Sequence, residues 1–372
     1  MRIGILSMQR IVNSGSFLQA YALKKTVEEI AGAPAEFIDF PNPLAETVRW
    51  KPLAVRVLKR GKHLLLPKYR QGERRKINKQ RFARRWREAL PELGLKTRPA
   101  GPSGTYDLVI IGSDEVFNLC QFTDAGKEVP WLLLGEGLET RRLISYAASC
   151  GQTDAGSASA AGIGERCAEL FGRFDALSVR DRNTAETVGT LSGRETLLHV
   201  DPALLLRDLP QAGENRKGAF RYLLVYAYSG RIRDPEETEA IRSFAEEKGL
   251  RIVCLNNTQD RAWKTVTVSP MDVPRWFAGA EYVVTDTFHG AAISVSTGAQ
   301  FAAFVRDSNR NKLSDLLERF GLEDRAVTPD HPLREVLERP ADREKVRAVL
   351  REERNRAAEY LQEEIAKAAE HG

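Results

Sequence analysis

The sequence has few of the features that would place it among metal-binding, redox, secreted or membrane proteins. It contains only four cysteines and five histidines in 372 residues. The cysteines are far apart in the sequence: Cys120, Cys150, Cys167 and Cys254. No C-x-x-C pair suggests zinc or a redox couple, so we expect no metal and no cofactor. No apolar run approaches the ~18 residues of a membrane span. The run at residues 3–7 is too short for a signal peptide, so we expect a cytoplasmic protein.

The positive charge is concentrated in one segment. The net charge is +5, but residues 51–90 carry fifteen Lys or Arg against two Glu, a local balance of +13. Only Tyr69, Phe82 and Trp86 are interspersed as aromatic residues, and no nucleic-acid-binding motif accompanies them. The pattern therefore predicts no nucleic-acid partner.

Two interpretations of residues 51–90 remain open. A charge-rich helical segment is most often a solvated face. Alternatively, the segment contacts anionic lipid, or a lipid-linked pyrophosphate, at the inner surface of the membrane. There each cation would add about 1 kcal/mol.

Strands and helices alternate along most of the chain, which indicates an α/β fold with parallel sheets. Apolar runs predict strands at 3–7, 36–40, 107–111, 143–147, 176–179, 222–227, 251–254, 282–285 and 301–305. Apolar periodicity predicts helices at 16–31, 235–248, 269–278 and 341–368. The predicted organisation is an N-terminal Rossmann-like domain at 1–206 with a basic helical excursion at 44–92, a second Rossmann-like domain at 220–340, and a helix at 341–372 packed on the body.

One strand end is the most informative local feature. A short apolar run ends in Asp286, Thr287, Phe288, His289 and Gly290, and a helical segment follows. Ligands bind outside the carboxyl ends of strands in open α/β sheets, and a helix N-terminus favours an anion. The pattern therefore indicates a binding site. The alternative is that Asp286 caps the helix and His289 only packs in the core.

Three other predicted strand ends also carry polar residues: Asn13-Ser14-Gly15, Gly112-Ser113-Asp114 and Ser178-Val179-Arg180-Asp181. Further polar residues are Asp201-Pro202, which precede Leu204-Leu205-Leu206, and Asn309-Arg310-Asn311-Lys312 at the start of a helix. Two facing Rossmann-like domains with such ends describe a cleft enzyme of the B-type glycosyltransferase architecture. Structural roles stay open: Asn13 and Gly15 as a tight turn, Asp201 as a turn former, and Arg180 in an ion pair with Asp181 or Glu186.

In combination these segments resemble the polysaccharide pyruvyl transferase family. The segments that carry the resemblance are 13–23 (NSGSFLQAYAL), 107–118 (DLVIIGSDEVFN), 145–151 (SYAASCG), 178–181 (SVRD), 201–205 (DPALL), 285–290 (TDTFHG) and 311–312 (NK). The first is similar to the family's N-x-G-x-x-L-Q-x-x-A-L and the second to its GSDQ-x-W-N. The matches extend from the first strand to about residue 325, and only the last helices lack a counterpart.

The resemblance implies an enzyme that moves a pyruvyl group from phosphoenolpyruvate to two hydroxyls of a carbohydrate or lipid-linked sugar, in the biosynthesis of a cell-surface polysaccharide or related glycan. It places Arg180 and His289 at donor-binding or catalytic positions. Our hypothesis for catalysis is that His289 acts as general acid and that Asp114 positions or deprotonates the acceptor. The expected donor-binding residues are Arg180, His289, Lys312 and Thr287. The expected acceptor or cleft-lining residues are Asn13, Gly15, Gln19, Ser113, Asn118 and Asp286.

The chain departs from the family pattern at three positions. Thr287 stands where some relatives have an arginine two residues before the histidine, Glu115 where Gln is usual, and Phe117 where Trp is usual. These differences put donor identity and acceptor choice in question. The alternatives are a glycosyltransferase of the same architecture with a nucleotide-sugar donor, and a non-catalytic glycan-binding relative.

Overall fold

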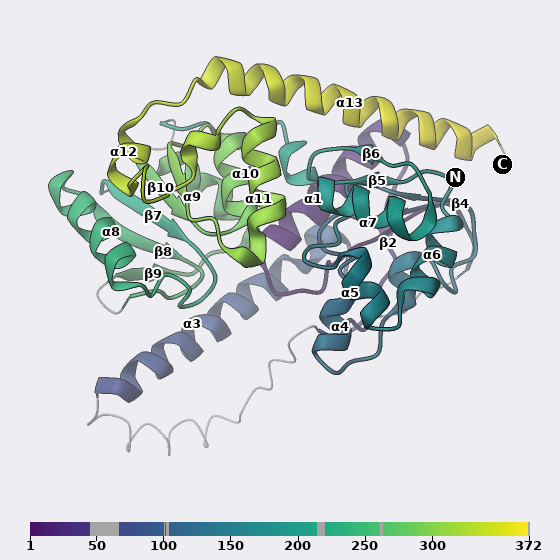
Figure 1. The fold of residues 1–372 in the computed structure, drawn as a ribbon, viewed down its shortest axis with the longest axis horizontal. Coiled ribbons are helices and arrows are strands. Elements are labelled where there is room, and N and C mark those ends of the chain that lie inside the picture. The colour runs from purple at the N-terminus through teal and green to yellow at the C-terminus, as the bar shows by residue number, and fades with distance from the viewer. Residues whose placement is uncertain (45–66, 100, 102–103, 214–219, 261–262, 371–372) are drawn as a thin grey trace.

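The protein folds around two separate parallel sheets, one from each half of the chain (Figure 1). The structure is a computed structural model that describes residues 1–44, 67–99, 101, 104–213, 220–260 and 263–370. The fold is α/β with two Rossmann-like halves, as the alternation of apolar runs predicted. No helix in these ranges combines the length and the apolar character needed to cross a bilayer.

The N-terminal sheet has the strand order β2-β1-β3-β4. Its strands are β1 (Ile3–Leu6), β2 (Ala35–Phe37), β3 (Tyr106–Ile111) and β4 (Thr140–Ser145), and isolated bridges connect β4 to the parallel pair β5 (Ser178–Val179) and β6 (Leu197–Leu198). Strand β1 is buried along its whole length, as is β3 from Leu108 to Ile111. Helices on both faces of a parallel sheet account for these continuous apolar runs.

The C-terminal sheet has the order β11-β10-β7-β8-β9, also parallel. Its strands are β7 (Tyr222–Tyr226), β8 (Arg251–Leu255), β9 (Lys264–Val266), β10 (Tyr282–Thr285) and β11 (Phe301–Ala303). The sequence predicted four of these strands. It gave no signal for β9, which is short and carries an exposed lysine.

Helices connect the strands. The α-helices are α1 (Ser14–Ala31), α3 (Pro67–Ala89), α4 (Cys120–Asp124), α5 (Ala155–Ala160), α6 (Gly164–Gly172), α7 (Arg182–Ser192), α8 (Pro235–Glu247), α9 (Val273–Gly279), α10 (Phe288–Thr297), α11 (Arg310–Arg319), α12 (Leu333–Glu338) and α13 (Arg343–Glu370). The 3-10 turns are η1 (Leu90–Leu93), η2 (Trp131–Leu134), η3 (Pro202–Leu204), η4 (Pro270–Asp272), η5 (Asp307–Asn309) and η6 (Glu323–Arg325).

The first helix begins earlier than predicted. The predicted start at Ser16 and the predicted loop at 13–15 are wrong, because Asn13 is the N-cap of α1. Its side-chain oxygen accepts a hydrogen bond from the Gly15 N–H at 2.7 Å, which replaces one of the partners that the first turn lacks. Ser14 and Gly15 are therefore helical and lie at the tip that faces the C-terminal half.

The basic segment is helical where the structure describes it. Helix α3 supplies much of the positive charge, and its buried Phe82 and Trp86 hold it on the body. Asn78 donates a hydrogen bond to Thr258 at 2.8 Å, so α3 reaches across to the C-terminal half. Residues 45–66, which include the start of the predicted basic excursion, lie outside the described ranges.

Helix α13 ties the two halves together on the opposite side. It begins beside the C-terminal half and runs over the N-terminal half (Figure 1). There the Tyr360 hydroxyl donates to the Ser145 carbonyl at 2.8 Å, and Glu364 forms an ion pair with Arg142 at 2.6 Å. The helix thus packs on the body of the protein, as its apolar seam predicted.

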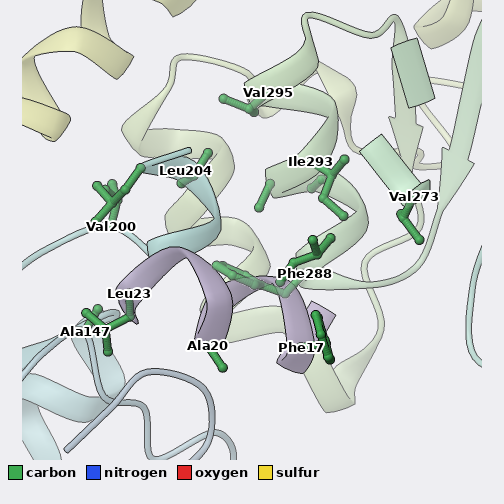
Figure 2. Close-up of a cluster of buried hydrophobic side chains, with 14 of the residues drawn as sticks. Phe17, Ala20, Leu23, Ala147, Val200, Leu204, Val273, Phe288, Ile293 and Val295 are labelled. Atoms are coloured by element: carbon green, nitrogen blue, oxygen red, sulfur yellow. The ribbon is translucent and has the colours of Figure 1, made fainter. Parts of the chain in front are cut away.

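The two halves share a continuous apolar core where α1 meets α10. Figure 2 shows Phe17 and Ala20 of α1 near Phe288 and Ile293 of α10, with Leu204 close by. All five side chains are at most 5% exposed. This packing brings the N-termini of α1 and α10 together, and the candidate site lies there.

Candidate functional site

Gly15 allows the two helix N-termini to meet at His289. A Cβ atom built on Gly15 would lie 2.2 Å from Cγ of His289, a distance that no real side chain could tolerate. The glycine is therefore required by close approach and not by an unusual backbone angle, since it lies in the first turn of α1. In this way the N-terminal half fixes the position of a histidine in the C-terminal half.

Asp201 lies beside the other edge of the imidazole. Its carboxylate is 3.6 Å from Nε2 of His289, and both side chains are buried. Nε2 has no hydrogen-bond partner among the described residues. The imidazole thus lies against a fixed carboxylate, and both groups are enclosed between the two halves of the chain.

Arg180 shares the same carboxylate. Its Nη1 donates to Asp201 at 2.7 Å, and the guanidinium lies 4.2 Å from the centre of the Phe288 ring. Burial alone would raise the pKa of Asp201, but His289 and Arg180 hold it well below its usual range. Burial opposes the charge on Arg180, yet its neighbouring carboxylates, Asp201 first, raise its pKa. This site therefore keeps a fixed carboxylate and a fixed guanidinium at neutral pH.

The structure corrects the ion pair that the sequence suggested for Arg180. Arg180 pairs with Asp201 and not with its sequence neighbours Asp181 or Glu186. Asp181 instead caps α7 and accepts a hydrogen bond from Ser149 at 2.6 Å. Asp201 does form a turn, since it accepts a hydrogen bond from the Ala203 N–H at 2.9 Å, and the same side chain also serves the site.

Lys312 and Glu115 form an ion pair between the two halves. Lys312 lies in α11 and Glu115 follows β3, and Asn118 also donates to Glu115, at 2.7 Å. Burial raises the pKa of Glu115, but Lys312 and Asn118 outweigh it and lower the pKa to about 2. Lys312 therefore faces the site as a cation whose charge is already paired.

Two cavities adjoin these residues. The smaller, of about 280 Å³, is lined by Arg180, Asp201, Phe288 and Lys312 among others. The larger, of about 480 Å³, lies between the halves and is lined by His289, Thr287, Asn13, Ser14, Tyr228, Asn256 and cationic residues of α3. His289 lines the larger cavity, and Asp201, which it contacts, lines the smaller one. The His289–Asp201 pair therefore lies between the two cavities.

Several residues predicted to line the cleft lie beneath it. Gln19 and Ser113 are 0% exposed and line neither cavity, so their prediction as cleft-lining residues is wrong. Gln19 donates to Ser7 and to the Ser16 carbonyl, each at 2.9 Å, and accepts from the Ser113 N–H at 3.3 Å. These bonds satisfy buried polar groups and fix the loop after β3 under the tip of α1.

Asp114 and Asn118 are also held by neighbouring side chains. Asp114 accepts a hydrogen bond from the Ser16 hydroxyl and has a left-handed backbone with φ of 69°. Asn118 bridges Glu115 and Thr153. Neither residue lines the two cavities, which corrects the cleft-lining prediction for Asn118. Asp114 is close enough to Arg180 to raise the pKa of that arginine.

Thr287, and not Asp286, caps α10. The Thr287 hydroxyl accepts a hydrogen bond from the Gly290 N–H at 3.0 Å. Asp286 is 0% exposed and lines neither cavity, so its predicted cleft-lining role is wrong. The alternative that it caps α10 is excluded because Thr287 is the N-cap. It lies 3.3 Å from Arg231 and 3.8 Å from Arg306. Burial raises the pKa of Asp286 to about 6, although the two arginines oppose this shift.

One wall of the larger cavity was not predicted from the sequence: it is formed by the residues that follow β8. Asn256 follows β8, has a left-handed φ of 61°, and donates to Ser14 at 3.0 Å across the interface. The stretch Asn256-Asn257-Thr258 is another polar strand end, so the signal used for the other four ends could have found it. The contribution of Arg75 and Lys76 of α3 to this cavity had no sequence signal.

Fold and site together define a two-domain α/β protein with GT-B-like architecture, in which polar strand ends lie at the interface. The chain belongs to the polysaccharide pyruvyl transferase family, whose model matches residues 13–308. The match covers Gly15, Arg180, Asp201 and His289 but not Lys312. No match was found among curated proteins.

Solved structures resemble the chain at low identity. The UDP-GlcNAc 2-epimerase of Methanocaldococcus jannaschii has 12% identity and a TM-score of 0.46, with all of both chains covered. The glycotransferase of kitacinnamycin has 12% identity and a TM-score of 0.46 over 98% of this chain and 99% of that one. For the O-GlcNAc transferase of Thermobaculum terrenum the values are 11% and 0.45, and the match covers 99% of this chain but only 66% of that protein.

Proposed function

We propose that the protein transfers a pyruvyl group from phosphoenolpyruvate to two hydroxyls of a carbohydrate acceptor, forming a pyruvate ketal and releasing phosphate. The observation that carries the proposal is the arrangement of Arg180 and His289 around one buried carboxylate, Asp201, beside the smaller cavity, which Lys312 also lines. Membership of the family supports the same chemistry. No cofactor is required, because the donor itself carries the group that is transferred.

The smaller cavity suits a small dianion. Phosphoenolpyruvate has a carboxylate and a phosphate close together, which need fixed cations. Arg180 offers a planar guanidinium whose Nε lacks a partner among the described residues, and Lys312 offers a compact charge suited to phosphate. Phe288 and Asp201 hold the guanidinium in place, so its orientation is set before the donor arrives.

Lys312 must exchange partners in this proposal. In the structure it is paired with Glu115, and the donor phosphate would compete with that carboxylate. Relatives usually have Gln at the position of Glu115, which would leave the lysine unpaired. Phosphate binding therefore requires this interdomain ion pair to loosen, and Glu115 tunes donor affinity.

Bond formation begins when an acceptor hydroxyl attacks C2 of the donor and the methylene carbon takes a proton. His289 supplies that proton, and Asp201 stabilises the imidazolium beforehand. The second hydroxyl then attacks C2, the C–O bond to phosphate breaks, and phosphate leaves with the electron pair. Of the two hydroxyl protons released, one goes to the departing phosphate and the other restores the protonated form of His289. Asp114 lines neither cavity, so in this proposal it acts on the acceptor indirectly: its carboxylate binds Ser16 in the first turn of α1, beside Asn13 and Ser14, which line the larger cavity.

The acceptor lies in the larger cavity in this proposal. Asn13, Tyr228, Asn256 and Thr287 offer amide and hydroxyl groups that suit sugar hydroxyls, and Arg75 of α3 lines the same space. The acceptor is a carbohydrate or lipid-linked sugar. A cytoplasmic location, with peripheral contact between residues 51–90 and anionic lipid, is part of the same proposal.

Phosphate release from phosphoenolpyruvate tests the proposal, measured with a library of glycans and lipid-linked sugars. We expect release to depend on the acceptor and to fall at least tenfold in Arg180→Lys and in His289→Ala. Arg173→Lys is the matched control, because Arg173 is exposed and has no ion pair among the described residues.

A thermal shift with a nucleotide sugar but none with phosphoenolpyruvate would favour the glycosyltransferase instead. Binding of a glycan without phosphate release from any acceptor would favour a non-catalytic relative.

A further inference from the structure

A third cavity, of about 230 Å³, lies at the other end of α10 and is lined by five arginines. They are Arg207, Arg343, Arg347, Arg351 and Arg354. This cavity shares no lining residue with the two cavities of the candidate site. Helix α10 has ten residues, so about 15 Å of helix separates the two ends.

Four of the arginines form a stripe along α13. Positions 343, 347, 351 and 354 follow the i, i+4, i+8, i+11 spacing that places side chains on one helix face. Like charges at this spacing repel each other and destabilise an isolated helix. None of the five arginines forms an ion pair with a carboxylate in the part of the chain that the structure describes. The stripe therefore has no carboxylate partner among the described residues, and three of its four arginines are exposed.

The other wall of the cavity is apolar. Its lining includes Val295, Ala299 and Phe301 from one side and Val346 and Leu350 from α13. These residues belong to the main hydrophobic core, so the cavity opens onto core surface. A cation-rich rim over an apolar floor matches a ligand that has an anionic head and a hydrocarbon body.

Two further observations show polar groups of this cavity that lack a favourable partner. The Ser296 hydroxyl lines the cavity, is 4% exposed and has no hydrogen-bond partner among the described residues. Arg354 donates only to backbone carbonyls, those of Leu204 and Leu206. Burial, and then the neighbouring charge of Arg207, lower the pKa of Arg354 to about 10. An anion placed here would reverse that unfavourable charge balance.

We propose that this cavity, which we call the arginine pocket, binds an amphipathic phosphate ester. The phosphate or diphosphate head would pair with the guanidinium groups of Arg347 and Arg351, which suit bidentate phosphate contacts. The first carbons of the hydrocarbon chain would lie on Val295, Val346 and Leu350. The inference is independent of the reaction proposed for the interdomain site.

Calorimetric titration of the full chain with geranyl diphosphate tests the proposal, because this probe has both the diphosphate and a short hydrocarbon chain. We expect it to bind more tightly than inorganic pyrophosphate or geraniol. The double variant Arg347→Gln, Arg351→Gln should weaken binding at least tenfold. Both side chains are exposed, so this variant is expected to keep its fold.

The matched control is the double variant Arg75→Gln, Lys76→Gln, which removes the same charge from the larger interdomain cavity. We expect it to leave geranyl diphosphate binding unchanged. Loss of binding in this control and retention in the α13 variant would place the probe at the interdomain site and overturn the proposal. Equal affinity for inorganic pyrophosphate would also overturn it, since the apolar floor would then contribute nothing. Absence of measurable binding would do the same.

Discussion

Nε2 of His289 lies 3.6 Å from a carboxylate oxygen of Asp201 that also accepts a hydrogen bond from Arg180. One buried carboxylate thus holds both an imidazole and a guanidinium. Because Arg180 and His289 come from different halves of the chain, Asp201 couples the orientation of one half to the other. The first prediction concerns this shared carboxylate.

Asp201→Asn should lower acceptor-dependent phosphate release by about 100-fold, the scale of losing one well-placed acid–base group. The variant keeps the size of the side chain but leaves Arg180 without its buried partner and the imidazolium without its nearest carboxylate. Phosphate release and the free energy of unfolding are measured on the same preparations. A loss of activity that is fully explained by a loss of folded protein would indicate that Asp201 only stabilises the fold.

Gly15→Ala should disturb His289 directly, because the added methyl would overlap the imidazole. We expect a loss of about 1–3 kcal/mol in the free energy of unfolding, as for other overpacked sites. Phosphate release should fall as in His289→Ala. Chemical denaturation and the phosphate assay measure the two effects.

Two variants control that experiment. Gly172→Ala adds a methyl to an exposed helical glycine with nothing within 4 Å, and it should change neither property. In the double variant Gly15→Ala, His289→Ala the overlap is gone, so part of the lost stability should return. If the two effects simply added, the close contact would not be the cause.

Glu115→Gln should increase the affinity for phosphoenolpyruvate several-fold, because Lys312 would no longer be paired with a carboxylate. Calorimetric titration measures the change, with Glu128→Gln as an exposed control. Unchanged or weaker affinity would show that Glu115 does not compete with the donor for Lys312.

The stability that the Glu115–Lys312 ion pair contributes should depend on pH, and Glu115→Gln can be used to measure this. The folded state lowers the pKa of Glu115 to about 2, below the ~4.3 of an unfolded glutamate. Its contribution to stability is therefore present above pH ~4.3 and is lost as the pH falls toward 2. The Tm difference between wild type and Glu115→Gln should be largest near neutral pH and should shrink across that range. A difference that does not depend on pH would contradict the ion-pair origin.

Asp286→Asn should stabilise the protein at high pH. Burial raises the pKa of Asp286 to about 6, so ionisation in the folded state is unfavourable relative to the unfolded chain, whose pKa is ~3.9. The penalty is absent below pH ~4 and complete above pH 6, where it amounts to about 1–3 kcal/mol. The Tm of the variant should exceed that of wild type at pH 8, and the two should converge near pH 4. A lower Tm at pH 8 would show that Arg231 and Arg306 outweigh burial.

Most of the fold was predictable because strand and helix signals are local. Apolar runs located β1, β3, β7, β8 and β10, whose burial along the strand comes from helices on both faces of each sheet. The elements that were not predicted correctly also have local causes. Strand β9 is three residues long with one exposed lysine, and the start of α1 was misplaced because Asn13 was taken for a loop residue when it is the cap.

The sequence by itself determined which strand ends carry polar side chains, because that depends only on the order of residues along the chain. It placed Arg180 and His289 at such ends, and Lys312 at the start of a helix. The tertiary structure decided their partners. Asp201 joins Arg180 to His289, and Glu115 holds Lys312, only because α1 packs against α10 and brings separate segments together. Packing also decided which predicted residues face a cavity: Asn13 does, while Gln19 and Asp286 are buried beneath it.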